Sequence, residues 1–192
     1  VEQLVLDWCG GKPDVANELW AVIGYTLPGL AHERVLPWLL GPRGSGKTTF
    51  LELLQHVMGT YAVQVQSGRT WVDDGGREPA DSIRSTRGCR LAWTDELPKR
   101  GRWREDIVKS FTGGGGNIAA EAKYKGRAAW RQQCKLWLAS NNEPADADDA
   151  LASRVRVYPF TGEFADPTFK TRLKETHGVA FLTCAVRASV TG

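Results

Sequence analysis

The sequence lacks the features that mark membrane, secreted and zinc-binding proteins. None of its apolar runs approaches the roughly 20 residues that cross a bilayer, and no secretory signal peptide opens it. Its four cysteines form no CxxC pair, and its three histidines complete no zinc-ligand spacing. We therefore expect reduced thiols, a cytoplasmic location and no membrane partner. Because the first residue is Val1 rather than Met, we also expect a segment of a longer protein.

The composition is that of an ordinary globular domain with an uneven charge. Of the 192 residues, 42% are hydrophobic and 24% are charged, which suffices for a core without disulfides. The net charge is +3, but residues 84–135 alone hold 13 Lys/Arg against 5 Asp/Glu. A basic block of this kind favours a polyanionic partner, although a solvated basic face would give the same count.

Strands and helices alternate along the predicted secondary structure. Residues 35–58 are predicted as a buried strand, a glycine-rich loop and a helix that stops at Gly59. Further strands are expected at 89–96, 135–140 and 155–160, with a hairpin over 118–133. This order predicts an α/β fold with a central, mostly parallel sheet flanked by helices. We expect a helical lead-in over 1–34, a core over 35–165 and C-terminal helices over 166–192.

The strongest motif is GPRGSGKT, a complete GxxxxGK[ST] between the first strand and its helix. Glycines let successive backbone N–H groups surround a phosphate at the positive end of a helix. Lys47 is expected to reach the β- and γ-phosphates of ATP, and the Thr48 hydroxyl to hold Mg²⁺. The alternative is a chance glycine-rich turn. The predicted ATP-binding residues are Gly41, Pro42, Arg43, Gly44, Ser45, Gly46, Lys47, Thr48 and Thr49.

Two later strand ends carry the polar groups that such a site needs. Asp95 and Glu96 end the strand LAWTDE, so we expect Asp95 to organise Mg²⁺ and Glu96 to act as the general base for an attacking water. An acid-rich helix start is the plainer interpretation of this pair. Asn141 is expected to hold the water, with Asn142 as the alternative, although asparagine after a strand is often only a turn residue.

The ordered set of motifs resembles the superfamily 3 helicases of the AAA+ type, and most closely the primase-helicases of phages and large DNA viruses. The resemblance runs through ELWAVIGYTLPG, GPRGSGKTTF, CRLAWTDELP, IVKSFTGGGGNIAAEAKYKG, KLWLASNNEP and SRVRVYPF, which span most of the chain. It implies an ATP-dependent DNA helicase motor of a phage or mobile element, working in a bacterial cytoplasm.

The resemblance also implies roles for residues outside the ATP motifs. Lys123 and Tyr124, with Lys125 beside them, match the DNA-gripping hairpin of the family, although such residues are also common on solvated hairpins. Arg154 matches the arginine finger that acts on the ATP of the neighbouring subunit, and Arg156 is the alternative finger. Lys109 matches a second basic position at the subunit interface.

The implied partners are single-stranded DNA and further copies of the chain, which we expect to form a hexameric ring. Primase or origin-binding regions of the same polypeptide are also implied. One departure from the family pattern is the glycine run 113–116, followed by Asn117 where proline is common, which leaves the hairpin register open by one residue.

Two other function classes fit part of the sequence. A P-loop small-molecule kinase would use residues 67–88 as a basic lid, but the Asp-Glu pair and the asparagine-tipped strand suit attack by water better. A nucleotide-dependent assembly module without hydrolysis would need a damaged motif, and Lys47, Glu96 and Arg154 are all present.

Overall fold

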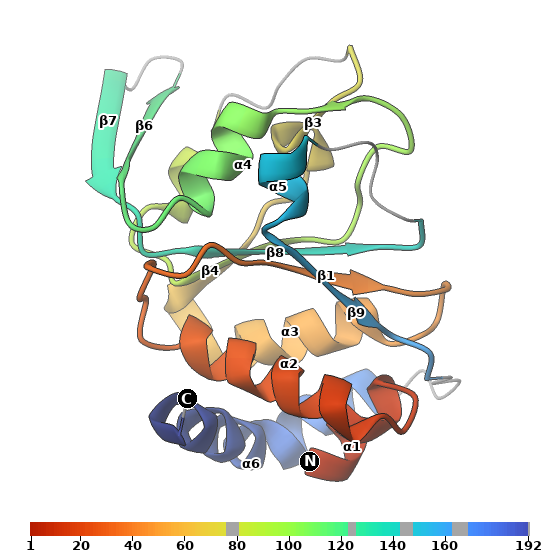
Figure 1. Ribbon diagram of the computed structural model, residues 1–192. Coiled ribbons are helices and arrows are strands. Elements are labelled where there is room, and N and C mark those ends of the chain that lie inside the picture. Colours follow the sequence, from red (N-terminus) through yellow and green to blue (C-terminus); the bar gives the residue numbers. More distant parts are fainter. Residues whose placement is uncertain (76–80, 123–125, 143–147, 163–168, 192) are drawn as a thin grey trace.

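The protein is a three-layer α/β structure in a computed structural model that describes residues 1–75, 81–122, 126–142, 148–162 and 169–191. In Figure 1 the central sheet is seen edge-on, with α1, α2, α3 and α6 below it and α4, α5 and a two-stranded hairpin above it. The predicted α/β class is therefore confirmed. Within the described residues, no helix combines the length and apolarity that crossing a membrane demands.

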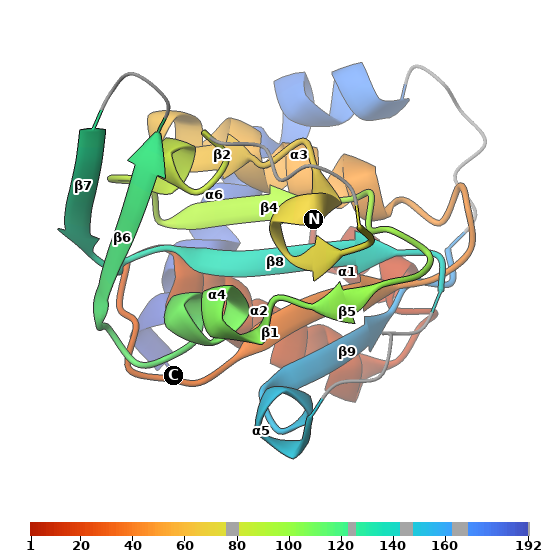
Figure 2. The same ribbon diagram turned by 90° about the horizontal axis from the view of Figure 1, so that it is seen from above.

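The central sheet has five parallel strands in the order β2-β4-β8-β1-β9. Figure 2 looks down on it, with β8 between β4 and β1. The carboxyl ends of parallel strands meet at one edge, so the residues that follow β1, β4 and β8 are gathered there. The strands are β1 (Leu36–Leu40), β2 (Ala62–Gln64), β4 (Leu91–Thr94), β8 (Lys135–Ser140) and β9 (Val155–Pro159).

Both faces of the sheet are buried, which explains why its central strands are continuous apolar runs. Alternate side chains point to opposite faces, so Trp38 enters the upper core while Leu39 enters the lower one. Phe50 lies at the centre of the lower core, with ring centroids 5.4 Å from Trp8 and Phe160 and 6.0 Å from Trp137.

Four helices form the lower layer of the described structure, two of them in the lead-in. The two lead-in helices are separated at Gly10 and Gly11, which have φ of 64° and 74°. Gly24 of the second helix packs so closely on the last helix that a Cβ would lie 2.6 Å from the backbone of Ala188. The four helices are α1 (Glu2–Trp8), α2 (Pro13–Thr26), α3 (Lys47–Met58) and α6 (Phe169–Thr191). The C-terminal region is thus one long helix rather than the several expected.

The upper layer holds the elements that sequence patterns defined least well. The hairpin of β6 (Asn117–Ala122) and β7 (Gly126–Arg131) was predicted, and the helix α4 (Glu105–Phe111) precedes it. The two-residue strands β3 (Val72–Asp73) and β5 (Arg102–Trp103) pair with each other and were not predicted, nor was α5 (Asp149–Ala152). The described residues also contain three short 3₁₀ turns, η1 (Gly59–Tyr61), η2 (Gly68–Thr70) and η3 (Arg84–Thr86).

Truncation of Phe50 should destabilise the whole domain. Its ring is fully buried among aromatic neighbours that come from α1, β8, α6 and the segment after β9. Phe50→Ala is expected to lower the free energy of unfolding by about 3–5 kcal/mol in urea denaturation. The control Val179→Ala, at a side chain that is 83% exposed, should change it by less than about 0.5 kcal/mol. Equal effects for the two variants would contradict this account of the core.

Candidate nucleotide site

The glycine-rich loop and the start of α3 lie together at the carboxyl edge of the sheet. Gly44 and Gly46 have φ of 85° and 87°, values that residues other than glycine rarely adopt. At Gly41 a Cβ would lie 2.0 Å from the carbonyl oxygen of Phe160, so only glycine fits there. The helix begins at Lys47, and the loop lies against its positive end.

Lys47 is held inside this loop by three oxygens. Its Nζ donates to the carbonyls of Gly41 and Pro42 at 2.7 and 2.8 Å and to Ser45 Oγ at 3.3 Å. The residue is 8% exposed, and burial lowers the pKa of its ammonium group, because a low dielectric disfavours the charged form. A lysine ammonium placed beside a glycine-rich loop is suited to bind a polyphosphate.

Thr48 and Asp95 meet although 47 positions separate them in the sequence. Thr48 Oγ1 donates to Asp95 Oδ2 at 3.1 Å, and Gln64 Nε2 donates to Asp95 Oδ1 at 3.2 Å. A hydroxyl and one carboxylate are oxygen donors that fit Mg²⁺, which usually completes its shell with water and substrate phosphates. Consistent with this sparse donor set, no group of three or more His, Cys, Asp or Glu side chains lies together in the described parts of the chain.

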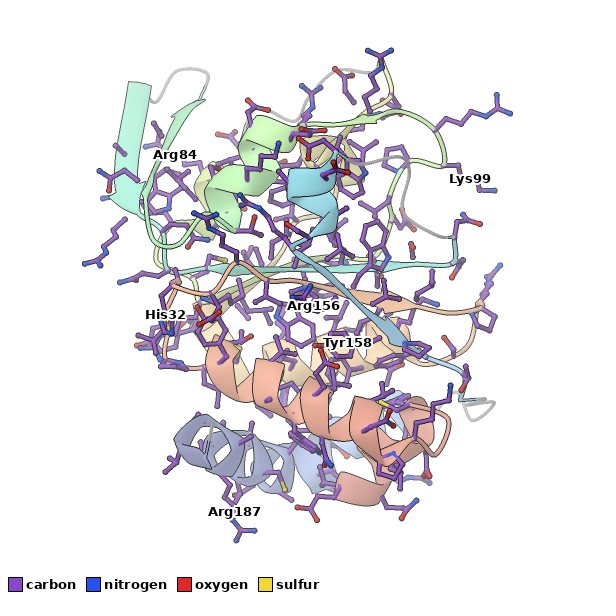
Figure 3. The ribbon with its side chains drawn as sticks, viewed as in Figure 1. His32, Arg84, Lys99, Arg156, Tyr158 and Arg187 are labelled. Atoms are coloured by element: carbon purple, nitrogen blue, oxygen red, sulfur yellow. The ribbon has the colours of Figure 1, made fainter. Side chains whose placement is uncertain are left out.

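Glu96 follows Asp95 and is exposed, on the wall of a cavity of about 250 Å³. The cavity is also lined by Ser67, Gly68 and Arg69. Gly68 packs against the backbone here, since a Cβ would lie 2.1 Å from the Glu96 carbonyl oxygen. Lys99 follows on the same loop and is labelled at the upper right of Figure 3. The geometry leaves the Glu96 carboxyl open to water, as a base for an attacking water requires.

The strand that ends in the two asparagines lies between the strands that carry the other two motifs. β8 pairs with β1 on one side and β4 on the other, so Asn141 and Asn142 emerge between the loop after β1 and the Asp-Glu pair after β4. Both are exposed. Ser140 Oγ accepts from Trp38 Nε1 at 2.9 Å and donates to the Asn142 carbonyl at 2.5 Å, which fixes the backbone turn that carries both amides.

Arg154 lies on the other side of β1 and is bonded within its own chain. Its Nη1 donates to Thr112 O at 3.0 Å, to Thr112 Oγ1 at 2.9 Å and to Lys109 O at 3.3 Å, while Nε donates to Ala150 O at 3.0 Å. The guanidinium thus satisfies carbonyls at the end of α4 and joins that helix to α5. To reach a neighbouring subunit it would have to leave them. Arg156 is exposed and donates to the nearby carbonyls of Ser153 and Val155.

Lys109 is likewise engaged inside the chain. Its Nζ contacts Glu105 Oε2 at 2.8 Å and Asp148 Oδ2 at 2.5 Å. The hydrogen bond from Lys109 is the main cause that holds the pKa of Asp148 at about 2. The remaining predicted contacts, Lys123, Tyr124 and Lys125, lie outside the described residues, between the two arms of the hairpin.

The structure therefore brings together Lys47, Thr48, Asp95, Glu96 and Asn141 at one edge, apart from Arg154 and Lys109. It adds Gln64, which sequence reasoning missed because the three-residue strand β2 has no periodic signal. A larger cavity of about 530 Å³ lies elsewhere, between α2, β9 and the segment 28–35. Figure 3 labels Tyr158 and Arg156 on β9 and His32 at its lining.

Comparison by sequence finds a matching family and a viral relative. Residues 39–154 match a group described as "Family of unknown function (DUF5906)". Over 143 residues the chain is 28% identical to "Putative helicase 022R" of Frog virus 3 (isolate Goorha), which covers 70% of this chain but 14% of that protein.

Solved structures of the NrS-1 C-terminal region have a similar fold. The apo structure of its residues 305–718 matches with a TM-score of 0.73 at 13% identity, over 96% of this chain and 44% of that chain. The A form apo structure matches with a TM-score of 0.72 at 13% identity, over 97% and 44%. The chain thus spans less than half the length of these relatives, and at such identity the likeness concerns the fold.

Removal of the Arg154 guanidinium should weaken the contact between α4 and α5. Arg154→Ala leaves the carbonyls of Lys109 and Thr112 without this donor, so we expect the free energy of unfolding to fall by about 1–3 kcal/mol in urea denaturation. Arg156→Ala is the matched control and should change it by less than about 0.5 kcal/mol. Identical stability of both variants would show that the Arg154 bonds are not formed in solution.

Proposed function

The chain belongs to the DUF5906 family of unknown function, and we propose that it is the ATP-hydrolysing motor region of a superfamily 3 replication helicase. The observation that carries the proposal is the bond between Thr48 and Asp95, with β8 placed between their strands. This bond joins the helix that follows the phosphate loop to the Asp95 carboxylate. Asn141, at the end of β8, lies between these two parts of the site.

The residues at this edge suit hydrolysis of ATP. Lys47 and the loop N–H groups bind the phosphates, and Thr48 and Asp95 hold Mg²⁺, which when bound offsets the phosphate charge. Glu96 accepts the proton of a water that Asn141 orients. The water oxygen bonds to the γ-phosphorus as the bond to the bridging oxygen breaks, which yields ADP and phosphate.

The strand order supports hydrolysis over the kinase alternative. A kinase must keep water away from the γ-phosphate and present a bound alcohol instead. Here Glu96 and Asn141 are both exposed, and Asn141 emerges between the loop and the carboxylates.

Conversion of hydrolysis into movement would use residues away from this edge. We propose that Lys123, Tyr124 and Lys125 grip the phosphates and bases of single-stranded DNA inside a ring of subunits. Arg154, with Lys109 nearby, would reach the ATP of the next subunit, which requires the guanidinium to exchange its bonds to α4 for the γ-phosphate. The relative named as a helicase supports this assignment.

Glu96→Gln should separate ATP binding from hydrolysis. The amide keeps the size of the side chain but cannot accept the proton, so turnover should fall by at least about 100-fold while affinity for ATP stays within about threefold. Phosphate release and equilibrium binding of a fluorescent ATP analogue measure the two effects. Lys47→Ala is the comparison variant and should lose binding itself; retained turnover in Glu96→Gln would refute the general-base assignment.

Mixing two inactive variants should restore activity if each ATP site is shared between subunits. Lys47→Ala cannot hold ATP and Arg154→Ala cannot donate a finger, but an interface that combines an intact Lys47 with an intact Arg154 is competent. We expect DNA-stimulated turnover to return to about a quarter of the wild-type rate at equal mixing, because a quarter of random interfaces pair the two intact residues. The measurement is phosphate release across mixing ratios. Phosphate release that stays near zero at every mixing ratio would show that Arg154 does not act across an interface.

A further inference from the structure

The Asp95 carboxylate is held from two sides by neutral donors. Thr48 Oγ1 donates to Oδ2 at 3.1 Å, and Gln64 Nε2 donates to Oδ1 at 3.2 Å. Each oxygen therefore has one donor from a different element, α3 on one side and β2 on the other. A carboxylate bonded at both oxygens cannot rotate about its Cβ–Cγ bond without losing a hydrogen bond.

The position of Gln64 follows from the pairing of β2 with β4. Gln64 is aligned with Trp93, so it lies on the side of the sheet that Asp95, two residues later, also faces. The next residue is tied to β4 twice: Val65 N donates to Trp93 O at 2.8 Å, and Thr94 Oγ1 donates to Val65 O at 2.8 Å. The backbone that carries Gln64 is thus fixed to the strand that carries Asp95.

We propose that Gln64 is a positioning residue that orients the Asp95 carboxylate for Mg²⁺, an inference that rests on the proposed function. Its amide occupies Oδ1, so Oδ2 stays directed at the Thr48 hydroxyl, and the two oxygen donors keep the separation at which one cation can bind both. Outer partners of this kind commonly change metal affinity about 10–100-fold when they are removed. Gln64 itself provides no charge and does not contact ATP in this scheme.

A purely structural role predicts a different pattern. Gln64 is half-buried at the end of a strand at the edge of the sheet, and the backbone bonds of Val65 hold that strand without it. If its amide only stabilised the strand, its loss would change thermal unfolding and leave the dependence of nucleotide binding on Mg²⁺ unaltered.

The test is a Mg²⁺ titration of nucleotide binding by the 192-residue chain. A fluorescent, non-hydrolysable ATP analogue is bound in EDTA and then at increasing Mg²⁺. In Gln64→Met, which keeps the length of the side chain but lacks the donor, the half-saturating Mg²⁺ concentration should rise about tenfold. Affinity in EDTA and the melting temperature should stay at the wild-type values. Gln133→Met, an exposed glutamine that precedes β8 at the opposite edge of the sheet, is the matched control and should not shift the titration.

An unshifted titration in Gln64→Met would overturn the inference, and so would an equal loss of binding in EDTA. If the Met variant does not fold, Gln64→Ala takes its place. A double-mutant cycle with Asp95→Asn adds a second check, because Gln64→Met should then shift the titration by less than about twofold, and a full shift in that background overturns the inference. Failure of the wild-type chain to bind the analogue at all, or to respond to Mg²⁺, would instead refute the proposed function.

Discussion

The contact on which the site depends is the hydrogen bond between Thr48 and Asp95. It connects the first turn of α3 to the end of β4, two elements separated by 47 positions that meet only because their strands belong to one parallel sheet. The register that aligns Trp93 with Trp137, and Leu138 with Thr94 and Trp38, sets the height at which the three strands end. A shift of one residue in any of them would turn the site residues to the other face of the sheet.

Aromatic residues on both sides of the sheet hold the strands and α3 in this alignment. Below the sheet, Phe50 packs among rings from several elements and so anchors the start of α3, which adjoins the glycine-rich loop. Above the sheet, Trp38 Nε1 donates to Ser140 Oγ, and Trp71 Nε1 donates to Thr94 Oγ1 at 2.9 Å. Buried indole groups thus satisfy the hydroxyls at the strand ends and keep the polar turns in place.

The basic residues divide into those that stabilise the chain and those that face solvent. Arg154 and Lys109 join α4 to α5 and its cap Asp148, so the region expected to face a neighbouring subunit is one connected unit in this structure. If Arg154 left these bonds to act as an arginine finger, the carbonyls at the end of α4 would lose their donor at the same time. Exchange of that kind would couple the ATP state of one subunit to the helix that precedes the hairpin of the next.

The sequence by itself determined the strand–loop–helix of 35–58, the positions of the main strands and the identities of Lys47, Thr48, Asp95, Glu96 and Asn141 as candidates, because these depend on local glycine chemistry and apolar runs. Only the tertiary structure decided that β8 lies between β1 and β4, that Gln64 reaches Asp95 and that Arg154 bonds to α4. Short elements such as β2, β3, β5 and α5 have too few residues for a periodic pattern, and they exist because longer neighbours pair with them or cap them. Local sequence encodes which groups are available, whereas contacts between distant segments determine which of them meet.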